Sequence, residues 1–304
     1  MNGCELRDVD KYWTHFELST RCAFDFVKKI FAFLSVSSLF IGGTGFFKTY
    51  IGYVLLGIHP NIQVCFAVFL ISFSVYTLDK IADLDKDVTN MPDRMRFLKG
   101  KKTLVMTCAV AAFLFSMALA FLDKPLSLLI ILVPVGANAI YGTRLIPGLP
   151  RLKDIPVMKN VVVAISWALV TILIPALHLS NPDSWLVFMV VYFMFIKTFI
   201  DTVLYDVRDV KGDRENGVRT IPVLLGSEKT VIVLLALNSS LLCGLIFVEG
   251  AIRLLLMALI VYGYAYILYF KERRNPLALD FCVEGEWMLA TAFLITILGG
   301  GMLA

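Results

Sequence analysis

Long apolar runs of about 20 residues, separated by short polar stretches, recur along the whole chain. A helix of this length matches the hydrocarbon core of a bilayer. No long linker or low-complexity stretch divides the runs, so we expect a single all-α domain over residues 1–304. The pattern predicts about nine transmembrane helices in a polytopic bundle, near residues 30–57, 61–82, 103–122, 125–142, 160–178, 184–204, 230–248, 251–270 and 284–303.

The N-terminal end of this pattern is the least regular. Gly42, Gly43, Gly45 and Lys48 interrupt the run over residues 30–57, which predicts either one tilted helix or a broken one. Residues 1–29 mix aromatic and basic side chains, a pattern typical of a helix that lies in the membrane interface. We therefore expect this segment to lie along the membrane.

The distribution of lysine and arginine predicts the orientation of the bundle. Eighteen of these residues fall in the loops after the second, fourth, sixth and eighth runs. The alternate loops hold only Lys124 and Arg253, or three cations if Lys48 belongs there. Because cytoplasmic loops are enriched in Lys and Arg, we expect a multi-pass protein with a cytoplasmic N-terminus.

Composition supports a membrane protein over a soluble one. Of the 304 residues, 59% are hydrophobic and only 17% are charged, and the mean hydropathy is +0.80. The basic run of Lys99, Lys101 and Lys102 is interpreted as a contact with anionic lipid headgroups. We expect membrane lipid as a partner and no nucleic acid.

Two sets of aspartates carry the chemistry. Asp79, Asp83 and Asp87 follow the second run at four-residue spacing, and a matching set follows the sixth run: Asp206, Asp209 and Asp213. These spacings keep each set on one helical face. Like charges on one face require a cation that holds them ionised, or a raised pKa on at least one of them. A divalent metal is the simplest candidate, and Mg²⁺ bound to carboxylates leaves positions for the oxygens of a diphosphate. We expect two metal sites, both on the cytoplasmic side.

The positions of these sets also predict an internal repeat. An acidic helix end follows the second run of the first four and the second run of the next four. This is the pattern of a parallel repeat of two four-helix units, with a ninth helix appended.

Asp201 lies deeper in the sixth run than the aspartate set. An ionisable residue at that depth is by default functional or paired, and Lys197, four residues earlier, is the obvious partner. Four tyrosines are candidates to line an apolar pocket beside the two acidic sets: Tyr76, Tyr141, Tyr192 and Tyr205.

The motifs resemble those of a known family. The stretch DKIADLDKD from Asp79, followed by NMPDR ending at Arg94, and the stretch DVRDVKGDRENGVRTIP from Asp206 resemble the two aspartate-rich motifs of the UbiA superfamily of intramembrane prenyltransferases. The resemblance extends to Tyr141, Lys153 and Asn160. The chain departs from it in two ways: Asp79 stands where the first motif commonly has Asn, and the usual Arg-Pro before the first span is absent.

The resemblance implies an isoprenoid-synthase-like helical bundle that moves an isoprenyl group from an allylic diphosphate donor to a lipophilic acceptor. Both aspartate sets would be catalytic metal ligands, and the diphosphate would be bound by Arg94, Lys153, Asn160 and Tyr141. Either an aromatic quinone precursor or a glycerol lipid is compatible with the motifs as acceptor.

A cation-coupled transporter is the alternative function. It would also use carboxylates inside a helical bundle, but near the middle of the membrane. The two aspartate sets instead cluster at one predicted face, which favours the enzyme.

Overall fold

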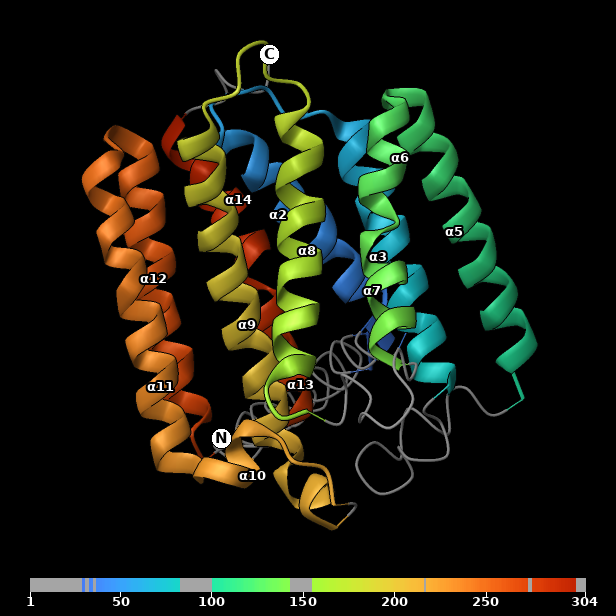
Figure 1. Ribbon diagram of the computed structural model, residues 1–304, viewed down its shortest axis with the longest axis vertical. Coiled ribbons are helices and arrows are strands. Elements are labelled where there is room, and N and C mark those ends of the chain that lie inside the picture. The colour runs from blue at the N-terminus through green and yellow to red at the C-terminus, as the bar shows by residue number, and fades with distance from the viewer. Residues whose placement is uncertain are drawn as a thin grey trace, which may run out of the picture.

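The computed structural model describes residues 29–30, 33–34, 37–82, 100–142, 155–215, 217–272 and 275–298. Every regular element in these ranges is helical, which confirms the all-α prediction. The helices run up and down through one bundle (Figure 1). In chain order they are α2 (Leu39–Leu55), α3 (Ile62–Ala82), α5 (Lys102–Asp123), α6 (Pro125–Ile131), α7 (Val133–Gly142), α8 (Met158–Ala176), α9 (Ser184–Glu215), α10 (Ile221–Leu225), α11 (Ser227–Ser240), the 3₁₀ helix η2 (Leu241–Phe247), α12 (Gly250–Phe270), α13 (Pro276–Leu279), the π-helical turn η3 (Asp280–Glu284) and α14 (Glu286–Leu298).

Six helical segments of the described chain are long and apolar enough to cross a membrane: α3, α5, α8, α9, α11 with η2, and α12. The other three predicted spans correspond to α2, to α6 with α7, and to α14, which are shorter. The polytopic membrane architecture is therefore confirmed, while the count of nine spans stays a prediction. The four-helix repeat and the interfacial position of residues 1–29 also stay predictions, the latter because residues 1–28 lie outside the described ranges.

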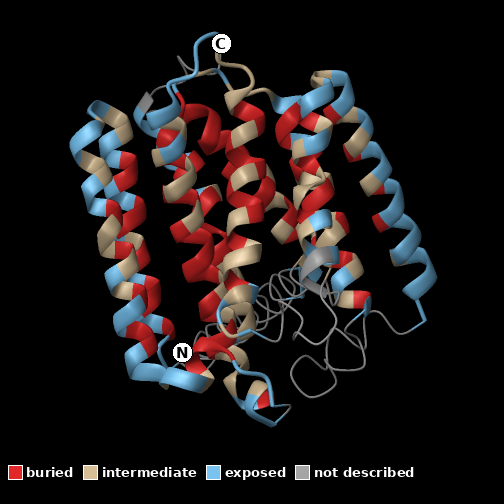
Figure 2. Cartoon of the chain, viewed as in Figure 1, coloured by how far each residue is buried: buried red, intermediate tan, exposed pale blue. Residues whose placement is uncertain are grey.

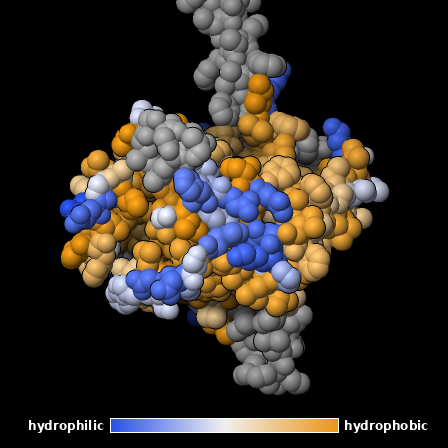
Figure 3. Space-filling model, turned by 90° about the horizontal axis from the view of Figure 1, so that it is seen from above, coloured by the Kyte–Doolittle hydropathy of each residue, from blue (hydrophilic) through white to orange (hydrophobic). Residues whose placement is uncertain are grey.

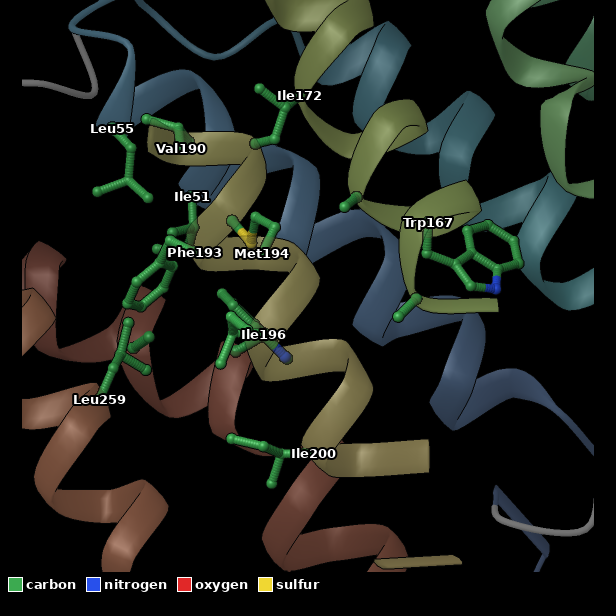
Figure 4. Packing of buried hydrophobic residues seen from close by; sticks show 14 of the residues in the cluster. Ile51, Leu55, Trp167, Ile172, Val190, Phe193, Met194, Ile196, Ile200 and Leu259 are labelled. Carbon is green, nitrogen blue, oxygen red and sulfur yellow. The ribbon is translucent and has the colours of Figure 1, made fainter. Parts of the chain in front are cut away.

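One apolar cluster fills the centre of the bundle, and α9 runs through it. Figure 2 shows buried residues on the inner faces of the helices and exposed residues on the outer faces. In Figure 4, side chains of α9 pack between those of α2, α8 and α12; the labelled ones are Ile51, Leu55, Trp167, Ile172, Val190, Phe193, Met194, Ile196, Ile200 and Leu259. The exposed outer faces still carry large apolar side chains, such as Leu114, Phe115 and Leu122 of α5, as lipid contact requires.

The upper end of the bundle in Figure 1 is tied together by a polar network. Asp123 at the end of α5 accepts hydrogen bonds from Asn61 (3.2 Å) and Ser127 (2.8 Å), and one of its oxygens lies 2.9 Å from Nε2 of His178. The other ring nitrogen of His178 lies 3.1 Å from the hydroxyl of Tyr53 on α2. Viewed onto this end in Figure 3, hydrophilic residues gather toward the centre and hydrophobic residues form much of the rim.

Candidate active site

The two aspartate-bearing helices end on the same side of the bundle. The last turn of α3, which holds Asp79, and the last turns of α9, which hold Asp206, Asp209 and Asp213, both lie at the lower end in Figure 1. Helix α8 begins at that end and packs against both α3 and α9. Asp83, Asp87, Arg94 and Lys153 lie outside the described residues, as does the side chain of Tyr141 in α7.

Asp206 is the best-enclosed carboxylate of the second set. It is buried, with Lys159 Nζ 3.1 Å from Oδ1 and Asn160 Nδ2 donating to Oδ2 at 2.8 Å. Asn160 also donates to the hydroxyl of Thr202, one turn earlier on α9. Both donors stand in the first turn of α8, so the start of α8 fixes the position of Asp206.

The other two aspartates of the set differ in how they are satisfied. Both carboxylate oxygens of Asp209 accept hydrogen bonds from Arg208, from Nε at 2.8 Å and from Nη2 at 2.6 Å. Asp213 has a buried Oδ2 that accepts no hydrogen bond from the described residues. It interacts electrostatically with Asp206 and with Lys159. Two carboxylates therefore share one lysine.

Asp79 lines a cavity of about 420 Å³ between α3, α5 and α7. The walls of this cavity are mostly apolar, with Leu78, Val110 and Phe113 among the lining residues. A mostly apolar cavity with a carboxylate of the first motif in its lining suits a molecule with a hydrocarbon chain and a polar head.

Of the three candidate tyrosines whose side chains the structure describes, two lie close to the aspartates. The ring of Tyr76 stacks on Trp167 of α8, with centroids 5.6 Å apart. The guanidinium of Arg208 lies over the ring of Tyr205, 4.9 Å from its centroid. Tyr192 is not near this site, because its hydroxyl bonds to Ser240 of α11 at 2.7 Å. Tyr76 and Tyr205 remain candidates to line the pocket, and Tyr192 does not.

The predicted pair of Lys197 with Asp201 is wrong. Asp201 pairs with Lys48 of α2, with Nζ and Oδ2 3.3 Å apart. Lys197 pairs with Glu286 of α14 at 2.5 Å, and it also donates to the hydroxyl of Tyr266. Asp201 is paired, as expected, but its partner lies on α2, and the partner of Lys197 lies on α14. Lys48, which interrupts the first apolar run, is a buried interior cation.

Comparison with known proteins identifies the family. The model of the UbiA prenyltransferase family matches residues 30–289. The chain belongs to this family. The resemblance seen in the aspartate-rich motifs is thereby confirmed.

Two curated proteins and a solved structure illustrate the likeness of this UbiA family member to others. A digeranylgeranylglyceryl phosphate synthase of Methanoculleus marisnigri is 29% identical over 183 residues, covering 56% of this chain and 59% of that protein. A synthase of the same name from Methanothrix thermoacetophila is 25% identical, covering 60% and 65%. The match thus spans about three-fifths of each relative. A UbiA homolog from Archaeoglobus fulgidus, solved bound to GPP and Mg²⁺, has a TM-score of 0.62 at 15% identity, covering 88% of this chain and 99% of that one.

The site of this UbiA protein includes two basic residues that sequence reasoning missed. Lys159 and Arg208 are two of the eighteen loop cations in the sequence, and each contacts an aspartate of the second motif. The sequence did hold a signal for both, because Lys159 directly precedes Asn160 and Arg208 lies inside the motif itself.

The second motif suits an oxygen-ligated cation. Among the described residues, no group of three or more His, Cys, Asp and Glu is gathered closely enough to hold a metal. However, Asp206 and Asp213 interact with each other, Oδ2 of Asp213 lacks a donor, and the cation beside them is the half-exposed side chain of Lys159. Magnesium prefers carboxylate oxygens together with water and phosphate, so these residues fit it.

Proposed function

We propose that this UbiA protein is a Mg²⁺-dependent prenyltransferase that moves an isoprenyl group from an allylic isoprenyl diphosphate to a lipophilic acceptor. The observation that carries the proposal is the meeting of both motif-bearing helix ends, α3 and α9, at one end of an apolar bundle. Charged diphosphate chemistry and a membrane-soluble product require such a boundary between polar and apolar surroundings.

The two aspartate sets would hold the metal. The interacting carboxylates of Asp206 and Asp213 support this for the second set. Asp79, Asp83 and Asp87 form one ligand set, and Asp206, Asp209 and Asp213 form the other. Bound Mg²⁺ supplies charge stabilisation to the departing diphosphate. We propose two ions, one for each aspartate motif.

Basic and amide side chains around the motifs orient the diphosphate. Arg94, Lys153, Asn160 and Tyr141 are proposed to contact its oxygens, as the family resemblance implies. Lys159 joins them, because its ammonium already lies beside Asp206 with half of its side chain exposed. Charge-assisted hydrogen bonds of this kind are short and strong.

The isoprenyl chain is proposed to occupy the mostly apolar cavity that Asp79 helps to line. Its walls keep water away from the allylic carbon while the bond to the diphosphate oxygen breaks. The aromatic faces of Tyr76 and Trp167, stacked on the adjacent helices, are electron-rich surfaces of the kind that attract a cation.

A glycerol lipid is the acceptor class that the relatives favour. Both curated relatives carry the name digeranylgeranylglyceryl phosphate synthase. A product with two geranylgeranyl groups requires an acceptor that already carries one. We therefore favour, as the acceptor of this protein, a glyceryl phosphate that already carries one geranylgeranyl group over an aromatic quinone precursor.

The motif end is proposed to face the cytoplasm. The loops with eighteen lysines and arginines connect helices at that end, and the positive-inside rule places them there. The N-terminus is then cytoplasmic as well.

One assay tests function and orientation together. Sealed membrane vesicles, either inverted or right-side-out, receive labelled geranylgeranyl diphosphate, Mg²⁺ and either the glyceryl phosphate acceptor or an aromatic acid. We expect prenylated product and diphosphate only in inverted vesicles, because the charged donor cannot cross the bilayer.

The controls are EDTA and the variant Asp206→Asn, each expected to lower the rate at least 100-fold while the protein remains folded. Diphosphate release that resists EDTA would contradict the metal dependence. Cation flux without any product would favour the transporter. Product in right-side-out vesicles alone would reverse the orientation.

A further inference from the structure

Five charged side chains outside the aspartate motifs are buried together in the interior of the bundle. They come from α2, α9, η3 and α14, and each has less than a tenth of its surface exposed: Lys48, Lys197, Asp201, Glu284 and Glu286. Three carboxylates thus face two ammonium groups. Burial of an unneutralised charge is costly unless the group gains a proton or a hydrogen-bonding partner.

Glu284 is the carboxylate without a lysine. Lys48 lies 3.3 Å from Asp201, and Lys197 lies 2.5 Å from Glu286. Within the described part of the chain, no ion pair reaches Glu284; its Oε1 accepts a long hydrogen bond, 3.4 Å, from Tyr205, and Thr44 of α2 also interacts with its carboxylate. Of the three carboxylates it is the one that forms no ion pair with a lysine.

A break in the helix turns Glu284 into the interior. Residues two positions apart on an α-helix point in nearly opposite directions, yet Glu284 and Glu286 are both buried. The π-helical turn η3 ends at Glu284, and α14 begins at Glu286. Gly285 between them leaves no room for a side chain, since a Cβ there would lie 2.1 Å from the carbonyl oxygen of Phe281. Single π-helical turns are frequent at functional sites.

Glu284 interacts with a residue of each motif-bearing helix. Tyr76, one turn before Asp79 on α3, interacts electrostatically with both Asp79 and Glu284. Tyr205, which directly precedes Asp206 on α9, donates to Glu284. Glu284 also keeps 7% of its surface exposed, against 2% for Asp201 and 1% for Glu286. It is therefore the most accessible of the three carboxylates.

We propose that Glu284 is the general base of the transfer reaction and accepts the proton that the acceptor loses. This inference rests on the proposed prenyl transfer to a glycerol hydroxyl. The hydroxyl oxygen of the acceptor forms a new bond to the allylic carbon, and the bond from that carbon to the diphosphate oxygen breaks. The electron pair of the broken bond leaves with the diphosphate, and the hydroxyl proton passes to a carboxylate oxygen of Glu284. Loss of that proton to water restores the base.

Some groups around Glu284 favour its charged form, and others favour its protonated form. The nearby ammonium of α2 and the tyrosine hydroxyl of α9 favour the carboxylate, whereas neighbouring carboxylates and burial favour the protonated acid. The groups concerned are Lys48 from α2, Tyr76 from α3, Asp201 and Tyr205 from α9, and Asp280 from the same turn. Such a balance suits a group that gains and loses a proton in each turnover.

The test compares Glu284→Gln and Glu284→Asp with the matched control Glu249→Gln, an exposed position at the start of α12. Each variant receives labelled geranylgeranyl diphosphate, Mg²⁺ and the geranylgeranylated glyceryl phosphate over a range of pH. Ether product and released diphosphate are measured separately, and thermal unfolding in detergent reports the fold.

We expect Glu284→Gln to lower product formation about 100-fold or more while diphosphate release by hydrolysis of the donor continues. We expect the wild-type rate of transfer to fall at acidic pH, where the base is protonated. The residual transfer by Glu284→Gln should not fall in this way. Glu284→Asp should retain part of the transfer, and Glu249→Gln should match the wild type.

Wild-type product levels and an unchanged pH profile in Glu284→Gln would overturn the inference. So would a folded Glu284→Gln in which product and diphosphate release fall equally, because that pattern indicates a structural role. If Glu284→Gln does not fold, Glu284→Asp decides: a shifted acid limb supports the base, and an unshifted one excludes it. Absence of transfer and diphosphate release in the wild type would instead remove the proposed function itself.

Discussion

At the scale of single residues, the ion pair of Lys48 and Asp201 is held in the interior by its surroundings. Lys48 also donates to the hydroxyl of Thr198 at 3.1 Å, and its ammonium lies 5.2 Å from the ring centroid of Trp287. With 7% and 2% of the two side chains exposed, water does not screen the pair. Removal of one partner from a buried pair leaves an uncompensated charge, which costs more than the pair contributes.

We therefore expect Lys48→Met to lower the free energy of unfolding by about 3 to 5 kcal/mol. The double variant Lys48→Met with Asp201→Leu should recover most of that loss, because neither charge then remains. Thermal or denaturant unfolding in detergent, followed by tryptophan fluorescence, measures both. The control is Lys271→Met, whose exposed pair with Glu272 at 3.8 Å should contribute nothing measurable. Additive losses in the double variant would contradict the pairing.

The sequence could identify the residues of the site more readily than their partners. Spacing placed Asp206, Asp209 and Asp213 on one helical face, and α9 does present them at one end of the bundle. Spacing also favoured Lys197, four residues earlier, as the partner of Asp201. The structure instead pairs Asp201 with Lys48 of α2, about 150 residues earlier in the chain. Periodicity reports neighbours within one helix, whereas contacts between helices depend on packing that a single sequence does not reveal.

At the scale of elements, close contacts between helices depend on glycines in α2. A Cβ at Gly52 would lie 2.5 Å from the carbonyl oxygen of Thr171 on α8, and one at Gly45 would lie 2.3 Å from the hydroxyl of Ser72 on α3. Small residues let transmembrane helices approach closely and pack. Packing against α3 therefore explains Gly45, one of the glycines that make the first apolar run irregular in the sequence.

Gly52→Ala should separate α2 from α8 and lower stability by about 1 to 3 kcal/mol, the range found for overpacked interiors. Because the obstructing atom belongs to the backbone of α8, a rotamer change cannot relieve the contact. The matched control is Gly136→Ala in α7, where no atom lies within 4 Å of the new methyl group. The control should be neutral or slightly stabilising, and equal melting temperatures for both variants would refute the close approach.

The turn before α14 shows what the pattern of apolar residues could not predict. Residues 284–303 read as one continuous span, but the helix is interrupted at Gly285, after a π-helical turn. That interruption places both Glu284 and Glu286 inside the bundle. A hydrophobicity pattern locates spans to within several residues and does not report a change of helix type inside them.

At the scale of the whole molecule, the two ends of the bundle differ in chemistry. One end carries Asp79 and the second aspartate set, while the other is closed by the network around Asp123 and His178. A membrane enzyme that takes a charged donor from one side needs this asymmetry. Its lipid substrates and product can reach the same end laterally, through the bilayer.

The most direct measurement for the central claim is a structure of the protein with Mn²⁺ in place of Mg²⁺ and a geranylgeranyl thiolodiphosphate that resists ionisation. Anomalous scattering locates the manganese independently of the protein. We predict metal between the carboxylates that follow α3 and those at the end of α9, bridged by the diphosphate, with the hydrocarbon chain in the cavity beside Asp79. Manganese and diphosphate bound elsewhere, or no metal at either aspartate set in a folded protein, would contradict the account.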